Sequence, residues 1–307
     1  MTEPGDDRDR AGPERRVDDA YEWLVDEPML HEPVLVVMLT GWIDAAGAAA
    51  AAAAALSKEC ETSPILRFDD DTFIDFRARR PVMELRDGIN TDLVWSSIEL
   101  RAGRSSSGRD LLVLTGPEPD MAWHRFGRAV SDLSVELGVT RMIAFGAYPF
   151  AAPHTRTPRL SCSSPSTDVL ANVTFARSSV DVPAGMAAAL EHALHARKIP
   201  ALGIWVQVPH YVAAMPYPAA SVALLDGLTE VTGIEVSAAD LRAAVGPQRS
   251  RIDASIDGNA EHLGMLRQLE ELYDATTDGE VSTGPVIEMR SGDELADEIQ
   301  AFLRDQD

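Results

Sequence analysis

A continuous apolar run, followed by a glycine and an alanine-rich segment, constrains the fold of this chain most. Residues 34–40 read VLVVMLT, and apolar side chains at nearly every position are typical of a strand covered on both faces in a parallel sheet. The run ends at Gly41, and Asp44 stands at an N-cap position before residues 45–56, where alanine strongly favours helix. The segment therefore predicts a strand, a turn and a helix in succession.

The same pattern returns along the chain. Strands are predicted at 110–115, 141–147 and 201–208, and helices at 121–137 and 184–196. This alternation predicts an α/β fold with a doubly wound, mostly parallel sheet. Residues 72–76 and 92–100 are predicted as further strands that extend or flank the sheet. The helix at 121–137 carries an apolar stripe of residues three or four positions apart: Trp123, Phe126, Val130, Leu133 and Leu137.

Composition divides the chain into four segments. Residues 1–17 are almost entirely polar, so we expect a disordered tail. Residues 18–217 hold the α/β domain, and residues 218–275 read as helix after helix, which predicts a small helical subdomain. Residues 276–307 are predicted as a loop and a C-terminal helix that docks on the main domain, because Ser291 and Glu294 have the spacing of a capping box.

Charge and hydropathy argue against several classes of partner. The formal net charge is −22, and residues 226–307 alone hold 19 acidic and 6 basic residues, so a nucleic acid would be repelled. No apolar run has the length of a membrane helix, and the N-terminal residues lack the apolar centre of a signal peptide. We therefore expect a cytoplasmic protein with neither a nucleic-acid nor a membrane partner. The sequence contains no Walker motif and no Gly-x-Gly-x-x-Gly, so no cofactor is predicted.

Polar residues gather in loops after predicted strands, where ligands of α/β proteins usually bind. A binding cluster built from them could hold an anion or a ribose. The competing interpretation is that the charged side chains cap helices and pair with one another, and loop position alone does not decide between the two. The candidate binding residues are Gly41, Trp42, Asp44, Arg79, Arg80, His154, Arg156, His210 and Tyr211.

Three further groups carry weaker signals. His192 and His195 lie beside Glu191 on a predicted helix, but a third metal ligand at suitable spacing is missing, so solvent-facing histidines are favoured. Residues Ser161–Ser164 offer hydroxyls and a thiol without a nucleophile elbow, which favours a polar loop. Residues Asp69–Asp71 could bind a divalent cation, although a turn between two strands explains them more simply. No catalytic residue and no metal site is therefore assigned.

Six segments, in order along the chain, carry a family resemblance. The resemblance spans about Val34 to Asp274 and leaves only the tails outside. Together they resemble the bacterial branch of the proteasome assembly chaperone family, sometimes called chaperone 2. The segments are Gly41–Ala46, Phe68–Pro81, Gly116–Asp120 with Trp123 and Phe126, Pro153–Arg156, Trp205–Ala213 and Leu269–Asp274.

The resemblance implies a three-layer α/β fold related in shape to nucleoside phosphorylases, with a helical appendage. It also implies a non-catalytic, chaperone-like protein that binds a protein partner, such as proteasome α subunits, and that forms a homo-oligomer, a dimer or a trimer. The alternative is a small-molecule binding protein for a nucleoside or an anion, or a hydrolase-like or phosphorylase-like enzyme that uses the loop cluster.

Overall fold

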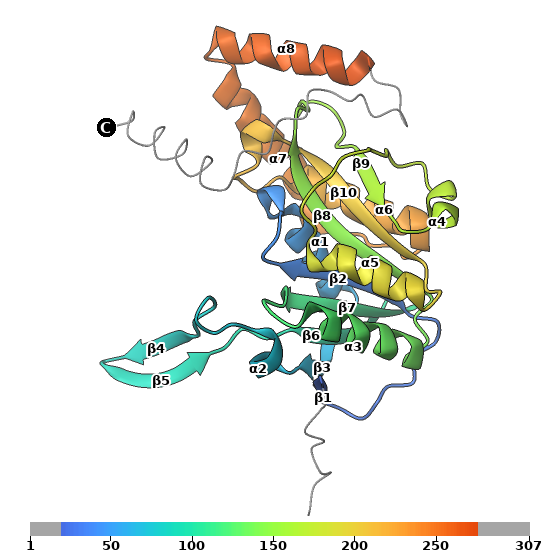
Figure 1. The fold of residues 1–307 in the computed structure, drawn as a ribbon. Coiled ribbons are helices and arrows are strands. Elements are labelled where there is room, and N and C mark those ends of the chain that lie inside the picture. Colours follow the sequence, from blue (N-terminus) through green and yellow to red (C-terminus); the bar gives the residue numbers. More distant parts are fainter. Residues whose placement is uncertain (1–19, 276–307) are drawn as a thin grey trace, which may run out of the picture.

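The structure of the chain, a computed structural model, describes residues 20–275. The predicted N-terminal tail and the predicted C-terminal helix lie outside these residues. Among those described, the main feature is an eight-stranded sheet with the order β1-β3-β6-β7-β2-β8-β10-β9 (Figure 1). Residues 20–275 include no helix that is both long enough and apolar enough to cross a membrane.

Four parallel strands form the centre of the sheet. They are β7 (Asp110–Pro117), β2 (Val34–Thr40), β8 (Arg141–Phe150) and β10 (Ala201–Pro209). All four were predicted from their apolar runs. Antiparallel strands flank them: β6 (Glu99–Arg104), β3 (Ser63–Phe68) and β1 (Tyr21–Trp23) on one side, and β9 (Leu160–Ser163) on the other. Strand β6 is antiparallel to β7, and β3 is antiparallel to β6. Strand β3 therefore runs in the same direction as the central strands.

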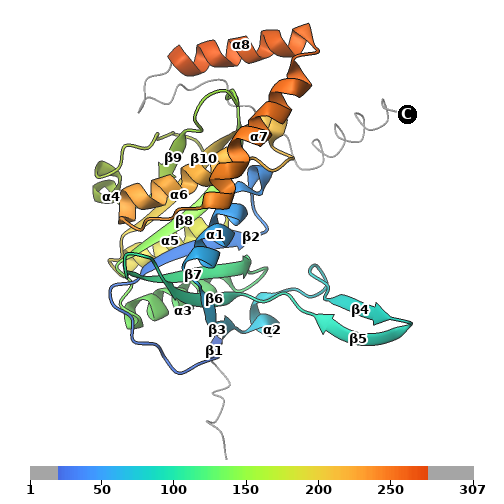
Figure 2. The ribbon, with the colours of Figure 1, turned by 180° about the vertical axis from the view of Figure 1, so that it is seen from behind.

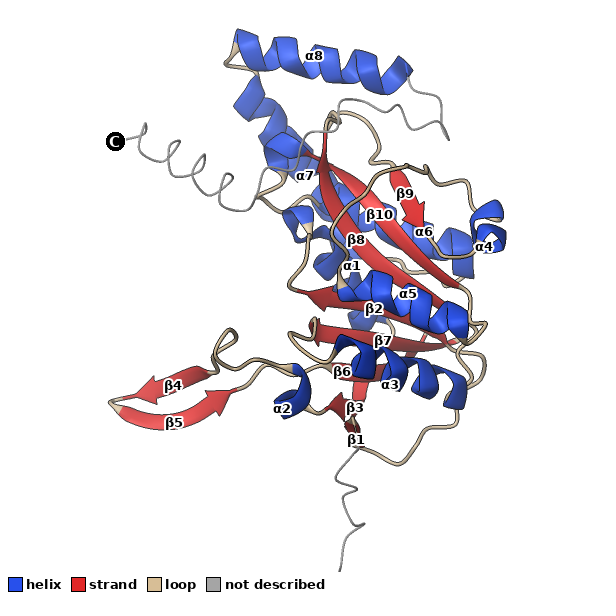
Figure 3. Cartoon of the chain, viewed as in Figure 1, coloured by secondary structure: helices blue, strands red, loops and turns tan. Residues whose placement is uncertain are grey.

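Helices cover both faces of this sheet (Figure 3). Helices α1 (Ala48–Glu59) and α6 (Pro218–Thr232) pack on one face, and α3 (Trp123–Glu136) and α5 (Met186–Ala196) pack on the other. Strand β2 shows why its sequence is apolar at successive positions: Val34 and Val36 enter one core, while Leu35 and Val37 enter the other. The predicted α/β fold with its doubly wound sheet is confirmed.

One predicted strand is wrong. Residues 72–76 do not extend the sheet, because α2 (Asp70–Phe73) and a turn occupy that segment. The hydroxyl of Thr72 donates to the carboxylate of Asp69, and the amides of Thr72 and Phe73 bond to the Asp69 carbonyl, which closes a helical turn. Phe73 and its neighbour Ile74 are both buried, whereas a strand with one covered face would alternate.

The predicted strand at 92–100 is also divided. Its first part belongs to β5 (Ile89–Val94), which pairs with β4 (Val82–Arg86) in a separate two-stranded sheet, and its last part opens β6. Figures 1 and 2 show this β4–β5 hairpin projecting from the body of the molecule. We call residues 82–94 the arm.

The helices after residue 218 differ in their packing. Helix α6 lies beside α1, where the Ser221 hydroxyl donates to the Ala48 carbonyl at 2.9 Å, so it belongs to a layer of the sheet. Helix α7 (Ala239–Ile256) packs against α6 and buries Ile252 and Ile256 in the same core, and α8 (Ala260–Ala275) follows it beyond the end of the sheet (Figure 2). The domain boundary at residue 218 stays a prediction. Three short helical segments complete the described chain: η1 (Ala45–Gly47), α4 (Thr167–Ala171) and η2 (His210–Val212).

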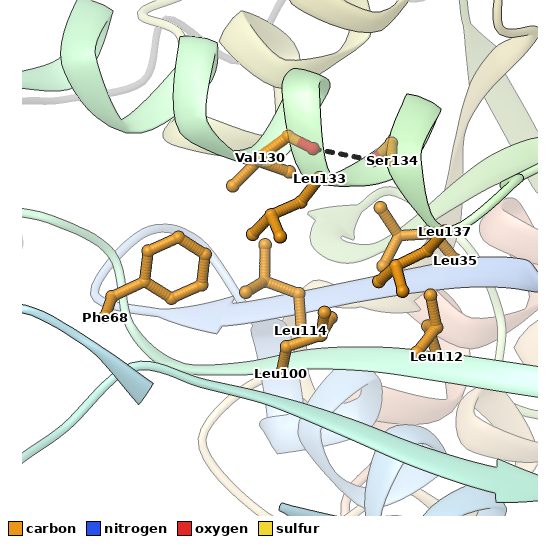
Figure 4. Close-up of a pocket in the computed structure, with 9 residues that line it drawn as sticks. All are labelled: Leu35, Phe68, Leu100, Leu112, Leu114, Val130, Leu133, Ser134 and Leu137. Carbon is orange, nitrogen blue, oxygen red and sulfur yellow. Dashed lines mark hydrogen bonds between the residues drawn. The ribbon is translucent and has the colours of Figure 1, made fainter. Parts of the chain in front are cut away.

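A small cavity lies between α3 and the sheet (Figure 4). Its volume is about 10 Å³, far below the roughly 300–1,000 Å³ of pockets that bind small molecules. Its polar member, Ser134, already donates to the Val130 carbonyl at 2.7 Å. We therefore interpret it as a packing gap in the core. The lining residues are Leu35, Phe68, Leu100, Leu112, Leu114, Val130, Leu133, Ser134 and Leu137.

Candidate functional site at the carboxyl edge of the sheet

The four polar loops meet at one edge of the sheet. Three of them follow β2, β8 and β10, which are parallel, so their carboxyl ends share an edge that we call the carboxyl edge. The fourth, which contains Arg79 and Arg80, lies between the end of β3 and the start of β6, and both of these ends face the same edge. The backbone amide of Ala46 also bonds to the Ala213 carbonyl, which joins the loops after β2 and β10.

Asp44 caps helix α1. Its two carboxylate oxygens accept from the amides of Ala49 at 2.8 Å and Ala50 at 3.0 Å. Burial raises the pKa of this carboxyl above its ordinary value of 3.8, and the bonds from the helix amides act in the opposite direction. The sequence correctly predicted a capping role, although α1 begins only after the short helix η1. Asp44 therefore stabilises a helix end, and its carboxylate is engaged within the protein.

Gly41, Arg79 and Asp120 form one compact group. Gly41 has a φ of +118°, and a Cβ atom there would lie 2.9 Å from Arg79 Nη2, so a larger residue would clash. The Arg79 Nε donates to both carboxylate oxygens of Asp120, at 3.1 and 3.0 Å. Trp42 is partly exposed and lies against Gly185, and Arg80 is exposed on the segment that leads into the arm. This group fixes the start of the arm to the loop after β7.

His154, Tyr211 and Asp253 form a second group, in which the His154 side chain is fully buried and the other two are partly exposed. His154 Nε2 lies 2.9 Å from Asp253 Oδ1 on α7, and its Nδ1 lies 2.8 Å from the Tyr211 hydroxyl. The His154 backbone amide donates to the same hydroxyl at 2.8 Å. One proton arrangement satisfies every contact: Nε2 donates to Asp253, and the tyrosine hydroxyl donates to Nδ1. His210 is exposed, with its ring 5.3 Å from that of Tyr211.

An aspartate, a histidine and a hydroxyl in a row can form a nucleophilic triad, but two observations oppose that reading here. Burial raises the pKa of Tyr211 to about 12, whereas an activated nucleophile needs a lowered pKa. The His154 side chain is fully buried, so a substrate could not reach its ring. The group instead connects the loops after β8 and β10 to α7.

Arg156 and Arg159 connect the loop after β8 to α8. Arg156 makes a bidentate pair with Asp274 at 2.9 and 2.7 Å, and it donates to Glu270 at 3.0 Å. These carboxylates raise the pKa of Arg156, chiefly through the hydrogen bond that it donates to Asp274. The guanidinium of Arg159 lies 3.7 Å from the centre of the Tyr273 ring. The Tyr273 hydroxyl donates to the Thr157 carbonyl at 2.6 Å.

These contacts combine into one unit, which we call the clamp. It brings together three of the predicted residues, His154, Arg156 and Tyr211, whereas Gly41 and Arg79 lie in the first group. Sequence reasoning missed the partners on α7 and α8. The spacing of Glu270 and Asp274, four apart on one face of a helix, was the available signal. The clamp consists of His154, Arg156, Arg159, Tyr211, Asp253, Glu270, Tyr273 and Asp274. A ligand-binding role for the predicted residues stays a prediction.

The weaker candidates are placed as follows. His192 and His195 are exposed, as expected, while Glu191 is buried and accepts a hydrogen bond from the Ser163 hydroxyl at 3.0 Å. Burial raises the pKa of Glu191 from 4.5 to about 7. Residues Ser161–Ser163 lie in β9 and Ser164 follows it, so this segment is an edge strand rather than the predicted loop. Within residues 20–275, no group of three or more histidine, cysteine, aspartate or glutamate side chains could hold a metal ion.

Comparisons with known proteins find solved structures with a similar fold. A crystal structure of a Corynebacterium glutamicum protein of unknown function is 30% identical over 83% of this chain and 97% of that chain, with a TM-score of 0.77. A Mycobacterium tuberculosis protein of unknown function is 32% identical over 87% and 92% of the two chains, also with a TM-score of 0.77. A proteasome-assembly chaperone homologue from the same organism is 30% identical over 77% and 99%, with a TM-score of 0.71.

No curated protein matches the chain. The family model of the PAC2 family matches residues 38–255. That range includes the last residues of β2 and every later strand of the main sheet, and it also includes His154, Tyr211 and Asp253. The match extends over more than half of the sequence, and the chain therefore belongs to the PAC2 family.

Proposed function

We propose that this chain is a chaperone-like factor that binds a protein partner, such as a proteasome α subunit, and acts in the cytoplasm as a homo-oligomer without catalysis. The observation that carries the proposal is membership of the PAC2 family, supported by the fold shared with a proteasome-assembly chaperone homologue. A protein-binding factor needs a stable surface and no reactive group, and the described carboxyl edge fits that need.

The polar loops support this reading over a small-molecule site. Asp44 caps a helix, His154 is enclosed by Tyr211 and Asp253, and Arg156 is paired with two carboxylates of α8. A ligand at these side chains would have to displace contacts that the protein already makes, and each displaced charged contact costs free energy. We therefore propose no substrate and no catalytic residue.

Co-expression with the proteasome α subunit encoded by the same genome tests the proposal. Native mass spectrometry should detect a complex of the two chains at micromolar concentration. A proteasome β subunit, expressed in the same way, is the matched control and should not be retained. Absence of any complex with the α subunit under these conditions would contradict the α-subunit assignment.

A further inference from the structure

The sheet face that carries α3 and α5 is covered over only part of its length. On this face the buried apolar core ends at Ala144 in β8 and Ala201 in β10, whereas on the opposite face it continues to Ala147 and Val208. Figure 1 shows α5 crossing in front of the lower parts of β8 and β10, and no helix crosses in front of their upper, C-terminal parts. The side chains on this stretch are polar or aromatic. Together with Glu191 of α5 we call them the sheet-face site: Tyr148, Ser161, Ser163, Trp205 and Gln207.

The Trp205 ring lies against the backbone of two glycines. Trp205 on β10 is opposite Gly146 on β8, and a Cβ atom at Gly146 would collide with Cε3 and Cζ3 of the indole. A Cβ atom at Gly203 would lie 3.0 Å from the indole Nε1. Because neither position carries a side chain, one face of the indole can rest on the sheet. The other face is directed away from the sheet, and the side chain is partly exposed.

The carboxyl of Glu191 lies beside this ring. Trp205 Nε1 donates to Ser163 Oγ at 3.3 Å, and the Ser163 hydroxyl donates to Glu191 Oε1 at 3.0 Å. A Cβ atom at Gly203 would lie 2.6 Å from Oε1 as well as 3.0 Å from Nε1, so the carboxyl and the indole meet over the same glycine. The two donors in series direct their protons toward the carboxyl, which favours its ionised form.

This carboxyl has no counter-charge among residues 20–275. Glu191 is 4% exposed, and its pKa is set by burial, which raises it, and by the Ser163 hydrogen bond, which lowers it, with no contribution from a charged side chain. Its second oxygen, Oε2, accepts no hydrogen bond from these residues, and it is not one of the fully enclosed polar atoms that lack a partner. Oε2 therefore keeps a small opening to solvent. A positively charged ligand would supply the missing counter-charge.

The surroundings of Oε2 favour an organic cation over other ligands. The net charge of −22 repels a phosphate group, and a neutral sugar would leave the carboxyl without a counter-charge. The outer face of an indole attracts a cation, and a carboxylate accepts a strong hydrogen bond from an ammonium group. The chain itself has only two lysines, Lys58 and Lys198. Both are exposed, and Lys58 pairs with Asp240.

We propose that the sheet-face site binds an alkylammonium group, with the carboxylate of Glu191 as its counter-ion and the outer face of Trp205 against its alkyl chain. Gln207 Nε2 donates to the Tyr148 hydroxyl at 3.2 Å, which holds the border of the site. The ammonium group arrives on a free amine or on a lysine side chain of another protein, and the chemistry is the same. The inference goes beyond the proposed function, because it assigns a ligand class and is tested without any proteasome subunit.

Isothermal titration calorimetry with butylamine, which has the ammonium and alkyl chain of a lysine side chain, tests the proposal. At about pH 8.5 the wild type should bind it with a Kd on the order of 1 mM or tighter, and should not bind butanol. Glu191→Gln should weaken binding about tenfold or more. Glu261→Gln removes an exposed negative charge of α8 and is the matched control, with an unchanged Kd. Absence of butylamine binding to the wild type, or equal weakening in the two variants, would overturn the proposal.

Proton release provides a test that needs no variant. Burial raises the pKa of Glu191 to about 7, so its carboxyl is largely protonated at about pH 6, and a bound ammonium group must displace that proton. Titrations at about pH 6, in two buffers with different heats of ionisation, should show release of close to one proton per butylamine. At about pH 8.5 the release should be small. Equal heats in both buffers at the lower pH would show that Glu191 is not the counter-ion.

The two sources of the ammonium group are distinguished with Nα-acetyl-lysine N-methylamide. Binding as tight as that of butylamine assigns the site to a lysine side chain of a protein partner, whereas binding of butylamine alone assigns it to a free amine. Trp205→Phe should weaken the binding of butylamine a few-fold, because a phenyl ring attracts a cation less than an indole does. An unchanged affinity in this variant would contradict the contact with the indole face.

Discussion

The clamp and the arm make opposite use of their side chains. The clamp is built from polar and charged residues, and each is bonded to another part of the same chain, such as His154 between Tyr211 and Asp253. The arm is built largely from apolar residues, and they are exposed, as Leu85 and Ile89 show. In most proteins polar residues mark the surface and apolar ones the core. Here several polar residues that were predicted to bind a ligand are engaged within the chain, and the apolar residues of the arm are exposed.

The contrast between the clamp and the arm follows from two free energies: that of a buried polar group without a partner and that of an exposed apolar side chain. A buried polar group without a hydrogen bond destabilises the folded state by about 1–3 kcal/mol, so the polar loops are satisfied internally. An exposed apolar side chain costs little in the monomer but gains free energy when it is covered, at about 25 cal/mol per Å². Internal polar contacts therefore fix the loops, while exposed apolar surface remains available for association.

Removing the imidazole at the centre of the clamp should have the largest effect. We expect His154→Ala to lower the free energy of unfolding by about 3–4 kcal/mol, because it removes the hydrogen bonds of the buried imidazole to Tyr211 and Asp253 and opens a cavity. Urea denaturation measures this. The exposed His210→Ala is the control and should change stability by about 0.5 kcal/mol or less. A His154→Ala variant as stable as the control would show that the clamp does not hold the fold.

Glu191 is a buried carboxyl whose contribution to the stability of the fold depends on pH. Its pKa is raised from 4.5 to about 7, so the folded state binds a proton that the unfolded state releases between these values. The stability that this provides is fully present below about pH 4.5 and is lost as pH rises through 7, by up to about 3 kcal/mol. Glu191→Gln cannot titrate, and its stability relative to wild type should therefore increase over this range.

The control for Glu191 is Glu261→Gln, which changes an exposed glutamate on α8 in the same chemical way. Its stability relative to wild type should be flat from pH 4 to 8 within about 0.5 kcal/mol. Thermal unfolding at several pH values compares the three proteins. A Glu191→Gln curve parallel to the wild-type curve would mean that the carboxyl is not protonated in the folded state.

Breaking the ion pair between Arg156 and α8 should have a local effect on that helix. Arg156→Ala removes the bidentate pair with Asp274 and the bond to Glu270. The contacts of Tyr273 with Arg159 and Thr157 remain, so α8 should loosen without detaching. Hydrogen exchange of the α8 amides should become faster, while exchange in β8 and β10 should stay the same. Arg156→Lys keeps the charge but loses the bidentate geometry, so it should give an intermediate rate. Equal rates in α8 for all three proteins would contradict the assignment.

The sequence predicted the centre of the fold better than the site. Strands β2, β7, β8 and β10 are buried on both faces, so their apolar runs are a local signal that needs no knowledge of the partner strands. The contacts of the clamp are not local: His154 and Asp253 are 99 positions apart, and Arg156 and Asp274 are 118 apart. The motifs that contain Arg156 and Asp274 were recognised separately, and no recognised motif contains Asp253. No pattern in the sequence indicated which of these residues pair.

The arm was missed for a different reason. Asp87 and Gly88 both have positive φ, as a two-residue hairpin turn requires, and Asp-Gly between apolar residues is a strong hairpin signal. From the sequence, only residues 92–100 were predicted as a strand, which would extend or flank the main sheet, and the turn signal before them was not used. Similarly, residues 72–76 were predicted as a strand, since Phe73 and Ile74 favour strands. The helical turn closed by bonds to the Asp69 carbonyl forms there instead.

A substitution in the arm should have the smallest effect on the stability of the monomer. Val82 and Val36 lose the same atoms when changed to alanine, but Val82 is 65% exposed and Val36 is fully buried. We expect Val36→Ala to cost about 2 kcal/mol and Val82→Ala less than about 0.5 kcal/mol when the protein is dilute and monomeric. Raising the protein concentration should separate wild type from Val82→Ala, because association stabilises the folded state by mass action and the variant associates less. Thermal unfolding over a hundredfold range of concentration measures the difference. Melting temperatures that do not depend on concentration in either protein would show that the exposed apolar face of the arm is not covered by a second copy.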